Sequence, residues 1–185
     1  RGELSSSALA TATAVFALAA VDRQAHADMV ARGLQWLREH RNDDGGWGDT
    51  PDSPSNISTT LLAWSALTLS EGSQSDQRAE SYIRSSASSL EADDIVSAVD
   101  RAYGGDRTFS APILTMCALA GRLGPPDRAW RRIAPLPFEL AAMPRAWLKW
   151  LRLPVVSYAL PALIAIGIAG QASIDKVAGP VGEAL

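Results

Sequence analysis

Four strongly apolar segments recur along the chain, and a serine precedes each of them. Their apolar residues follow helical spacing. The serines and the segments behind them are Ser7 with Ala8 to Val21, Ser58 with Leu61 to Leu69, Ser110 with Ile113 to Ala120, and Ser157 with Leu160 to Ile168. Serine is a favourable N-cap, because its hydroxyl accepts a hydrogen bond from an unpaired N–H of the first helical turn. The serines recur at an interval of about 50 residues, which is typical of a structural repeat.

Amphipathic stretches lie between the apolar segments. In them, apolar residues recur at the spacing of one helix face. The positions are Val30, Gly33, Leu34 and Leu37 in one stretch, and Ala79, Tyr82, Ile83, Ala87 and Leu90 in another. The pattern predicts an all-α fold in which apolar inner helices are covered by amphipathic outer helices. Helix hairpins repeated in two such layers form an α/α toroid or a partial α-α barrel.

The predicted helices form one continuous series. Breaks in the pattern contain Gly, Pro and Asp, but no linker separates two domains. We therefore expect residues 1–185 to form a single helical domain. Since the chain starts at Arg1 and stops at Leu185 in a Gly- and Pro-containing stretch, we expect it to be a fragment of a longer polypeptide.

The composition is that of an ordinary globular protein. Of the 185 residues, 47% are hydrophobic and 20% are charged, and the net charge is -3. The lack of a basic tract argues against a nucleic-acid partner. Cys117, the single cysteine, lies in an apolar run, and with His26 and His40 it gives no zinc-ligand spacing. We expect a reduced, cytoplasmic protein without a metal or other cofactor.

The segment from Arg32 to Trp47 carries a specific motif. It reads Arg-Gly-Leu-Gln-Trp-Leu-Arg-Glu-His-Arg-Asn-Asp-Asp-Gly-Gly-Trp and resembles the QW motif of squalene and oxidosqualene cyclases. The matching positions are Arg32, Gly33, Trp36, Leu37, Gly45 and Trp47, and Arg41 stands where the family has Gln. In the family, this Gln ties helix ends together and stacks on the Trp. The alternative is a chance Gly-Gly-Trp loop after a helix.

Arg41 departs from the motif but has chemistry that suits the same structural role. Its guanidinium would stack on Trp47 and donate hydrogen bonds to unpaired carbonyl groups at helix ends. Later segments also resemble the family, so that the resemblance covers most of the chain. They are Asp52 to Leu67, Arg107 to Phe109 with Cys117 to Gly121, Pro135 to Leu140, and Leu153 to Tyr158.

The resemblance implies the N-terminal domain of a class II terpene cyclase, an isomerase of terpenoid biosynthesis that folds a polyprenyl chain such as squalene into rings. The inner helices would form part of the apolar substrate cavity, beside a C-terminal catalytic domain of the same polypeptide. Phe109 and Tyr158, at inner-helix starts, are the residues that we predict to line the cavity. Another class of function stays open, namely a non-catalytic toroid that binds a lipid or a protein.

The chain lacks the acidic motif that starts catalysis in this family. Class II cyclases protonate an alkene or epoxide with the middle Asp of an Asp-x-Asp-Asp run at an inner-helix start. The corresponding residues 56–60 read Asn-Ile-Ser-Thr-Thr, so we assign no catalytic residue. Glu91 to Asp94 spells Glu-Ala-Asp-Asp, but acidic residues are common in a first helical turn because they interact favourably with the helix dipole. Asp49, Asp52 and Asp106 are interpreted as turn or cap residues.

One segment fits the monotopic membrane location of the family. Arg145 to Arg152 mixes basic residues with Trp147 and Trp150, as interfacial helices do. We therefore expect peripheral attachment to a membrane surface. The alternative is that both indoles pack inward. Leu153 to Ala169 is apolar but contains two prolines, which favours a buried inner helix over a membrane span.

Overall fold

The computed structural model describes residues 6–71, 76–104 and 107–133, and all regular secondary structure in these ranges is helical. The described helices are α1 (Ala8–Asp22), α2 (Ala27–Glu39), α3 (Ile57–Glu71), α4 (Gln77–Ala87), α5 (Ala92–Tyr103), α6 (Arg107–Leu119) and α7 (Pro126–Arg132). The predicted all-α class is confirmed.

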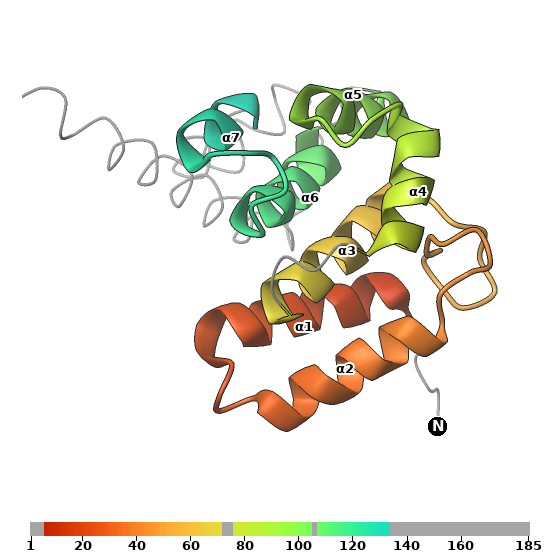
Figure 1. Cartoon of the computed structure of the whole chain (residues 1–185), viewed down its shortest axis with the longest axis vertical. Helices are drawn as coiled ribbons and strands as arrows, with labels where there is room; N and C mark the ends of the chain where they lie inside the picture. The colour runs from red at the N-terminus through yellow and green to blue at the C-terminus, as the bar shows by residue number, and fades with distance from the viewer. Residues whose placement is uncertain (1–5, 72–75, 105–106, 134–185) are drawn as a thin grey trace, which may run out of the picture.

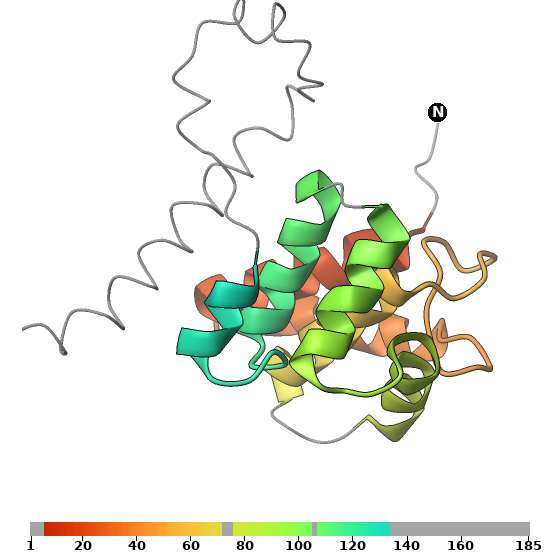
Figure 2. The same ribbon diagram turned by 90° about the horizontal axis from the view of Figure 1, so that it is seen from above.

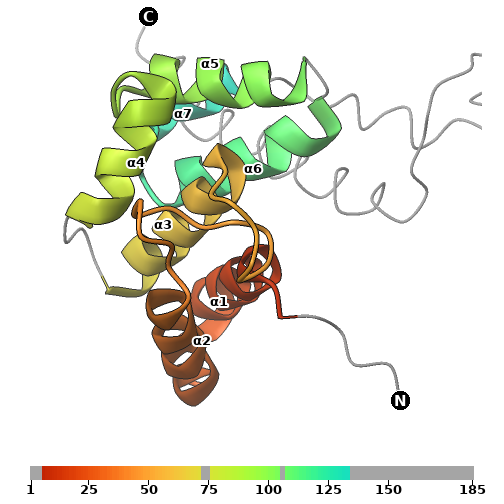
Figure 3. The same cartoon turned by 90° about the vertical axis from the view of Figure 1, so that its right-hand side faces the viewer.

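Helix α3 lies at the centre of the described part of the chain. It packs between α1 on one side and α6 on the other (Figure 1; Figure 3). Every residue from Ser58 to Thr68 is buried, so α3 is covered on all sides. α1, α3 and α6 contain the first three apolar segments of the sequence and form the inner layer.

The amphipathic helices α2, α4 and α5 cover this inner layer. α2 packs on α1 and α3, α4 packs on α3, and α5 packs on α3 and α6. Figure 2 shows α5 and α6 side by side. The buried residues predicted from helical spacing include Val30, Leu34 and Leu37 of α2, and Ala79, Ile83 and Ala87 of α4. The described helices thus have the expected inner and outer layers.

The predicted serine cap is correct for α1 and wrong for α3. Ser7 is the N-cap of α1, and its Oγ accepts a hydrogen bond from the N–H of Ala10 at 3.2 Å. α3 begins one residue before Ser58. The side chain of Asn56 accepts the bond from the N–H of Thr59 at 2.8 Å instead. Asn is as good a cap as Ser, and here it stands in the position that caps the helix.

The predicted cap of α6 is also wrong. This helix begins at Arg107, so Ser110 lies within it and is buried. The first helical turn contains Arg107, Thr108 and Ser110 besides Phe109 and precedes the apolar run, so the apolar pattern alone places the helix start too late. Ser157 and its segment lie outside the described residues.

None of the helices in the described ranges is long and apolar enough to cross a membrane. The segment from Leu153 to Ala169, predicted as a buried inner helix, lies outside those ranges. Trp147 and Trp150 do so as well.

Candidate functional site

Trp47 is the buried centre of the Arg32–Trp47 motif, with 0% of its surface exposed. Its indole Nε1 donates to the carbonyl of Leu37, in the last turn of α2, at 2.7 Å. Its backbone N–H donates to Oγ1 of Thr60, in the first turn of α3, at 3.0 Å. Trp47 therefore joins the end of an outer helix to the start of the next inner helix.

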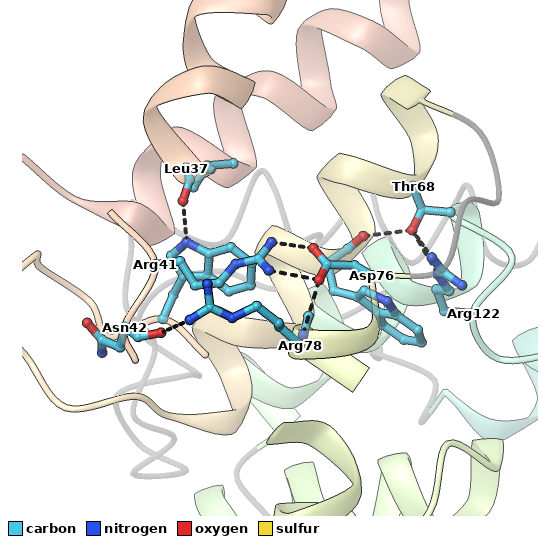
Figure 4. A network of polar contacts seen from close by, with 10 residues as sticks. Leu37, Arg41, Asn42, Thr68, Asp76, Arg78 and Arg122 are labelled. Atoms are coloured by element: carbon cyan, nitrogen blue, oxygen red, sulfur yellow. Dashed lines mark hydrogen bonds and ion pairs between the residues drawn. The ribbon is translucent and has the colours of Figure 1, made fainter. Parts of the chain in front are cut away.

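Arg41 covers the Trp47 indole, with its guanidinium carbon 4.5 Å from the ring centroid. Its hydrogen-bond acceptor is Asp76, however, and not the carbonyl groups expected from the sequence (Figure 4). Nη1 donates to Oδ1 of Asp76 at 2.8 Å, and Nη2 donates to Oδ2. The Arg41 side chain is only 11% exposed, and a cation at that depth is stabilised more by an anion than by neutral acceptors.

Asp76 has a second role as the N-cap of α4. Its Oδ1 also accepts a hydrogen bond from the N–H of Ala79 at 3.2 Å. Two residues later, Nη2 of Arg78 donates to the carbonyls of Asn42 and Asp43, at 3.4 Å each. The first turn of α4 therefore holds the loop that follows α2.

Gly45 allows this loop to approach α4 closely. Its φ is +90°, in the left-handed region that favours glycine. A Cβ at this position would lie 2.4 Å from the carbonyl oxygen of Arg78. The Gly-x-Trp part of the motif is therefore required by backbone contact as well as by backbone conformation.

The other motif residues lie in α2, and three of them determine how this helix packs. Leu37 is fully buried, and Gly33 faces α1 so closely that a Cβ would lie 2.3 Å from Cγ2 of Val15. Trp36 is half-buried and stacks on His40, with ring centroids 4.0 Å apart. Arg32 is exposed.

A second arginine and tryptophan pair lies at the C-terminal end of α6. Arg122 stands over the ring of Trp64 at 3.9 Å, and its Nε donates to Oγ1 of Thr68 at 2.8 Å (Figure 4). Thr68 in turn donates to the carbonyl of Trp64 at 2.7 Å. Burial lowers the pKa of Arg122, and the nearby Glu80 opposes that shift most strongly. The pair ties α6 to α3, as Arg41 and Trp47 tie the motif loop to α4.

Asp76 provides a test of this polar network. Replacing it with alanine removes the cap of α4 and the anionic partner of Arg41. We expect the free energy of unfolding, measured by urea denaturation, to fall by about 2–3 kcal/mol. Asp76→Asn keeps a capping oxygen, so it should lose less, and Asp43→Ala, at an exposed loop position, is the neutral control. Equal stability of Asp76→Ala and Asp43→Ala would contradict the dual role.

The start of α3 is held by a carboxylate from the motif loop. Oδ1 of Asp49 accepts hydrogen bonds from Nδ2 of Asn56 at 2.9 Å and from Oγ1 of Thr59 at 2.6 Å. The backbone carbonyl of Asp49 accepts from the N–H of Ala8 at 3.1 Å. Asp49 is exposed, and these contacts give it the turn role expected from the sequence.

The acidic run from Glu91 to Asp94 opens the amphipathic helix α5. Glu91 occupies the N-cap position without a side-chain cap bond, and Oδ2 of Asp94 accepts from the hydroxyl of Ser89 at 2.5 Å. Asp93 pairs with Arg132 at 2.6 Å. That hydrogen bond, together with the charge of Arg132, lowers the pKa of Asp93. The carboxyl is therefore ionised at neutral pH and is a poor proton donor.

Phe109 lies in the first turn of α6 and is 55% exposed. Its ring stacks on Tyr103 of α5, with centroids 5.6 Å apart. Tyr158, the other predicted cavity residue, lies outside the described ranges.

The described residues contain no group of three His, Cys, Asp or Glu side chains that could hold a metal ion. Cys117 is fully buried in α6. Burial raises the pKa of its thiol to about 11, so the thiol stays protonated at neutral pH.

Comparison with known proteins identifies the family to which this chain belongs. Residues 1–94 match the family described as squalene-hopene cyclase N-terminal domain. The chain belongs to this family. The matched region contains α1 to α4, the motif loop and the acidic run that opens α5.

A curated relative of this squalene-hopene cyclase N-terminal domain is the squalene hopane cyclase afumA of Aspergillus fumigatus (strain CBS 144.89 / FGSC A1163 / CEA10). The two are 34% identical over 86 residues, which are 45% of this chain and 12% of the relative. The chain thus spans a small part of the relative's length. No solved structure matches the chain.

Within the squalene-hopene cyclase N-terminal domain, the partners of the motif could not be recognised from the sequence. Asp76 and Arg78 begin α4, about 30 residues after the motif, and no local spacing connects them to it. The presence of Arg41 in place of Gln indicated that such a partner exists, since a buried guanidinium is usually paired with a carboxylate. Arg122 and Trp64 belong to no motif that could be recognised in the sequence.

Proposed function

We propose that this chain is the N-terminal part of a squalene-hopene-type terpene cyclase, an isomerase that acts on a polyprenyl substrate such as squalene. The observation that carries the proposal is the family match over residues 1–94. The relative is a squalene hopane cyclase by name, which supports the same substrate class.

The inner layer supports a role in shaping an apolar cavity. α1, α3 and α6 are inner helices that pack in chain order, as in an arc of an α/α toroid. We propose that further helices of the polypeptide complete the toroid and that Phe109 and Tyr158 line the cavity. The 55% exposure of Phe109 leaves its ring available for such contact.

We further propose that the Arg32–Trp47 segment is a variant of the family's QW motif and that the protonating acid lies outside this chain. The start of α3 offers an amide and hydroxyl groups, which do not protonate alkenes at neutral pH. Glu91 to Asp94 opens a helix whose outer face is polar, and Asp93 is paired with Arg132.

The test is turnover of squalene by the longest native polypeptide, with products identified by gas chromatography and mass spectrometry. We expect rings to form with that polypeptide and no product with residues 1–185 alone. Absence of product from the complete, folded polypeptide would favour the non-catalytic toroid that binds a lipid or a protein.

A triple variant tests the assignment of the acid. We expect Glu91→Gln, Asp93→Asn and Asp94→Asn together to leave turnover in the complete polypeptide within about twofold, because these side chains do not supply the proton. Circular dichroism would verify the fold. Loss of turnover with the fold retained would make this run the acid.

We propose a cytoplasmic location with peripheral attachment to a membrane through Trp147 and Trp150. Replacing both with serine is expected to move the complete polypeptide from the membrane pellet to the soluble fraction, since the indoles are the interfacial groups of a basic segment. Trp36→Ser, in a half-buried outer position, is the control. An unchanged partition of a folded double variant would show that the two indoles pack inward.

A further inference from the structure

Two aromatic rings are stacked at the point where α5 ends and α6 begins. Tyr103 is the last residue of α5, and Phe109 lies in the first turn of α6. The ring centroids are 5.6 Å apart, and the ring planes differ by 16°. Beyond the effect of the area that it buries, such a pair is favoured about two- to tenfold over the separated rings.

The two side chains differ in how firmly the rest of the fold holds them. Tyr103 is half-buried and packs against the hydrophobic core. Phe109 is 55% exposed, and a side chain exposed to that extent ordinarily exchanges among its rotamers. Tyr103 is therefore the anchored member of the pair, and the orientation of the Phe109 ring depends on the stack.

The backbone on both sides of the stack is fixed. Gly104 ends α5 in a left-handed conformation, with φ at +58°, and its N–H donates to the carbonyl of Asp100. α5 and α6 pack side by side (Figure 2). The residues that follow Phe109 in α6, Ser110 and Ala111, are buried. The position of the Phe109 backbone is thus set by helix packing, which leaves the side-chain rotamer for the stack to determine.

We propose that Tyr103 is a positioning residue, which holds the Phe109 ring in the orientation that contacts the polyprenyl substrate. This inference rests on the proposed function, which assigns Phe109 to the wall of the apolar cavity. Phe109 makes the contact, and Tyr103 acts through it. A preset ring strengthens an apolar contact, because the substrate does not have to order a mobile side chain when it binds.

The orientation of the Phe109 ring can be measured without turnover. 4-Fluorophenylalanine is incorporated at position 109 of the full chain, and its fluorine NMR signal is recorded with and without Tyr103→Leu. Since a stacked ring shifts the signal of a neighbouring nucleus, this substitution should move the signal toward that of the unfolded chain, whereas Tyr103→Phe should not. The same label at Phe16 of α1, which is 5% exposed, is the control. An unchanged signal at position 109 in folded Tyr103→Leu would overturn the proposal.

Turnover of squalene by the complete polypeptide tests the contact with substrate. We expect Tyr103→Leu to raise KM about two- to tenfold and to leave kcat within about twofold, since an apolar wall contact is made equally with bound substrate and transition state. Tyr103→Phe should restore KM. Phe109→Leu should raise KM as well, and adding Tyr103→Leu to it should raise KM no further, because Tyr103 acts through Phe109.

Three kinetic results would contradict this role. A lower kcat at unchanged KM in Tyr103→Leu would mean that Tyr103 serves stability alone. A further rise of KM in the double variant would mean that Tyr103 contacts the substrate itself. Absence of turnover in the complete polypeptide would overturn the proposed function together with the substrate contact, whereas the fluorine signal decides separately whether Tyr103 holds the ring. Should Tyr103→Leu fail to fold, Tyr103→Met is the second variant.

Discussion

Replacing Trp47 with alanine is expected to lower the free energy of unfolding by about 3–5 kcal/mol, the range found for buried aromatic residues truncated to alanine. The indole is fully buried, and its Nε1 donates to the carbonyl of Leu37 at 2.7 Å. The substitution leaves a cavity, frees that carbonyl and removes the ring beneath Arg41. Urea denaturation followed by circular dichroism measures the loss.

Two matched variants separate the contribution of the indole N–H from that of the buried aromatic ring. Trp47→Phe keeps an aromatic ring and loses the indole N–H, so it should cost about 1–2 kcal/mol for the unpaired carbonyl and some packing besides. Trp36→Ala removes another tryptophan of the same motif, but one that is half-buried on α2. If Trp47→Ala were no more destabilising than Trp36→Ala, the structural reading of the motif would be wrong.

Gly45→Ala is expected to lower the free energy of unfolding by about 2–4 kcal/mol, although it adds only a methyl group. The left-handed conformation costs a non-glycine residue about 1 kcal/mol, and overpacking adds about 1–3 kcal/mol. The overpacking arises because the new Cβ would lie 2.4 Å from the backbone oxygen of Arg78, which a side-chain rotation cannot move. The loop and the first turn of α4 must therefore separate.

Gly104→Ala is the control for backbone conformation. Gly104 also has a positive φ, of +58°, but a Cβ there meets nothing within 4 Å. Its replacement should cost about 1 kcal/mol, for conformation alone. Equal losses in the two variants, measured by urea denaturation, would mean that Gly45 does not make the close contact.

The inner and outer helices could be predicted from the sequence because the extent to which a helix is buried determines which of its positions are apolar. A helix buried on all sides, such as α3, has apolar residues around its whole circumference, whereas α2 and α5 are apolar on one face. The starts of the inner helices were harder to predict, because Asn56 and the largely polar first turn of α6 stand outside the apolar runs. The residue that caps a helix is the one whose side chain reaches the first-turn N–H groups. The positions of apolar residues do not show which residue that is.

The motif was predictable as a sequence but only partly as a set of contacts. The stack of Arg41 on Trp47 followed from the chemistry of a guanidinium and an indole. Its ion pair with Asp76 did not, since that pair joins the loop after α2 to the N-cap of α4 and depends on how α4 approaches the loop. The contact of Arg122 with Trp64 could not be predicted for the same reason, because it joins the end of α6 to the middle of α3.

The burial of α3 from Ser58 to Thr68 has a consequence for how the domain folds. Its sequence is rich in residues of modest helix propensity, namely Ser58, Thr59, Thr60, Ser65 and Thr68. An isolated helix of this composition is unstable in water, so its helicity depends on burial between α1 and α6. Its amide protons should therefore exchange with solvent only when the whole domain opens. Folding has to bring together segments about 50 residues apart, and is expected to be slower than in helical proteins built from local contacts.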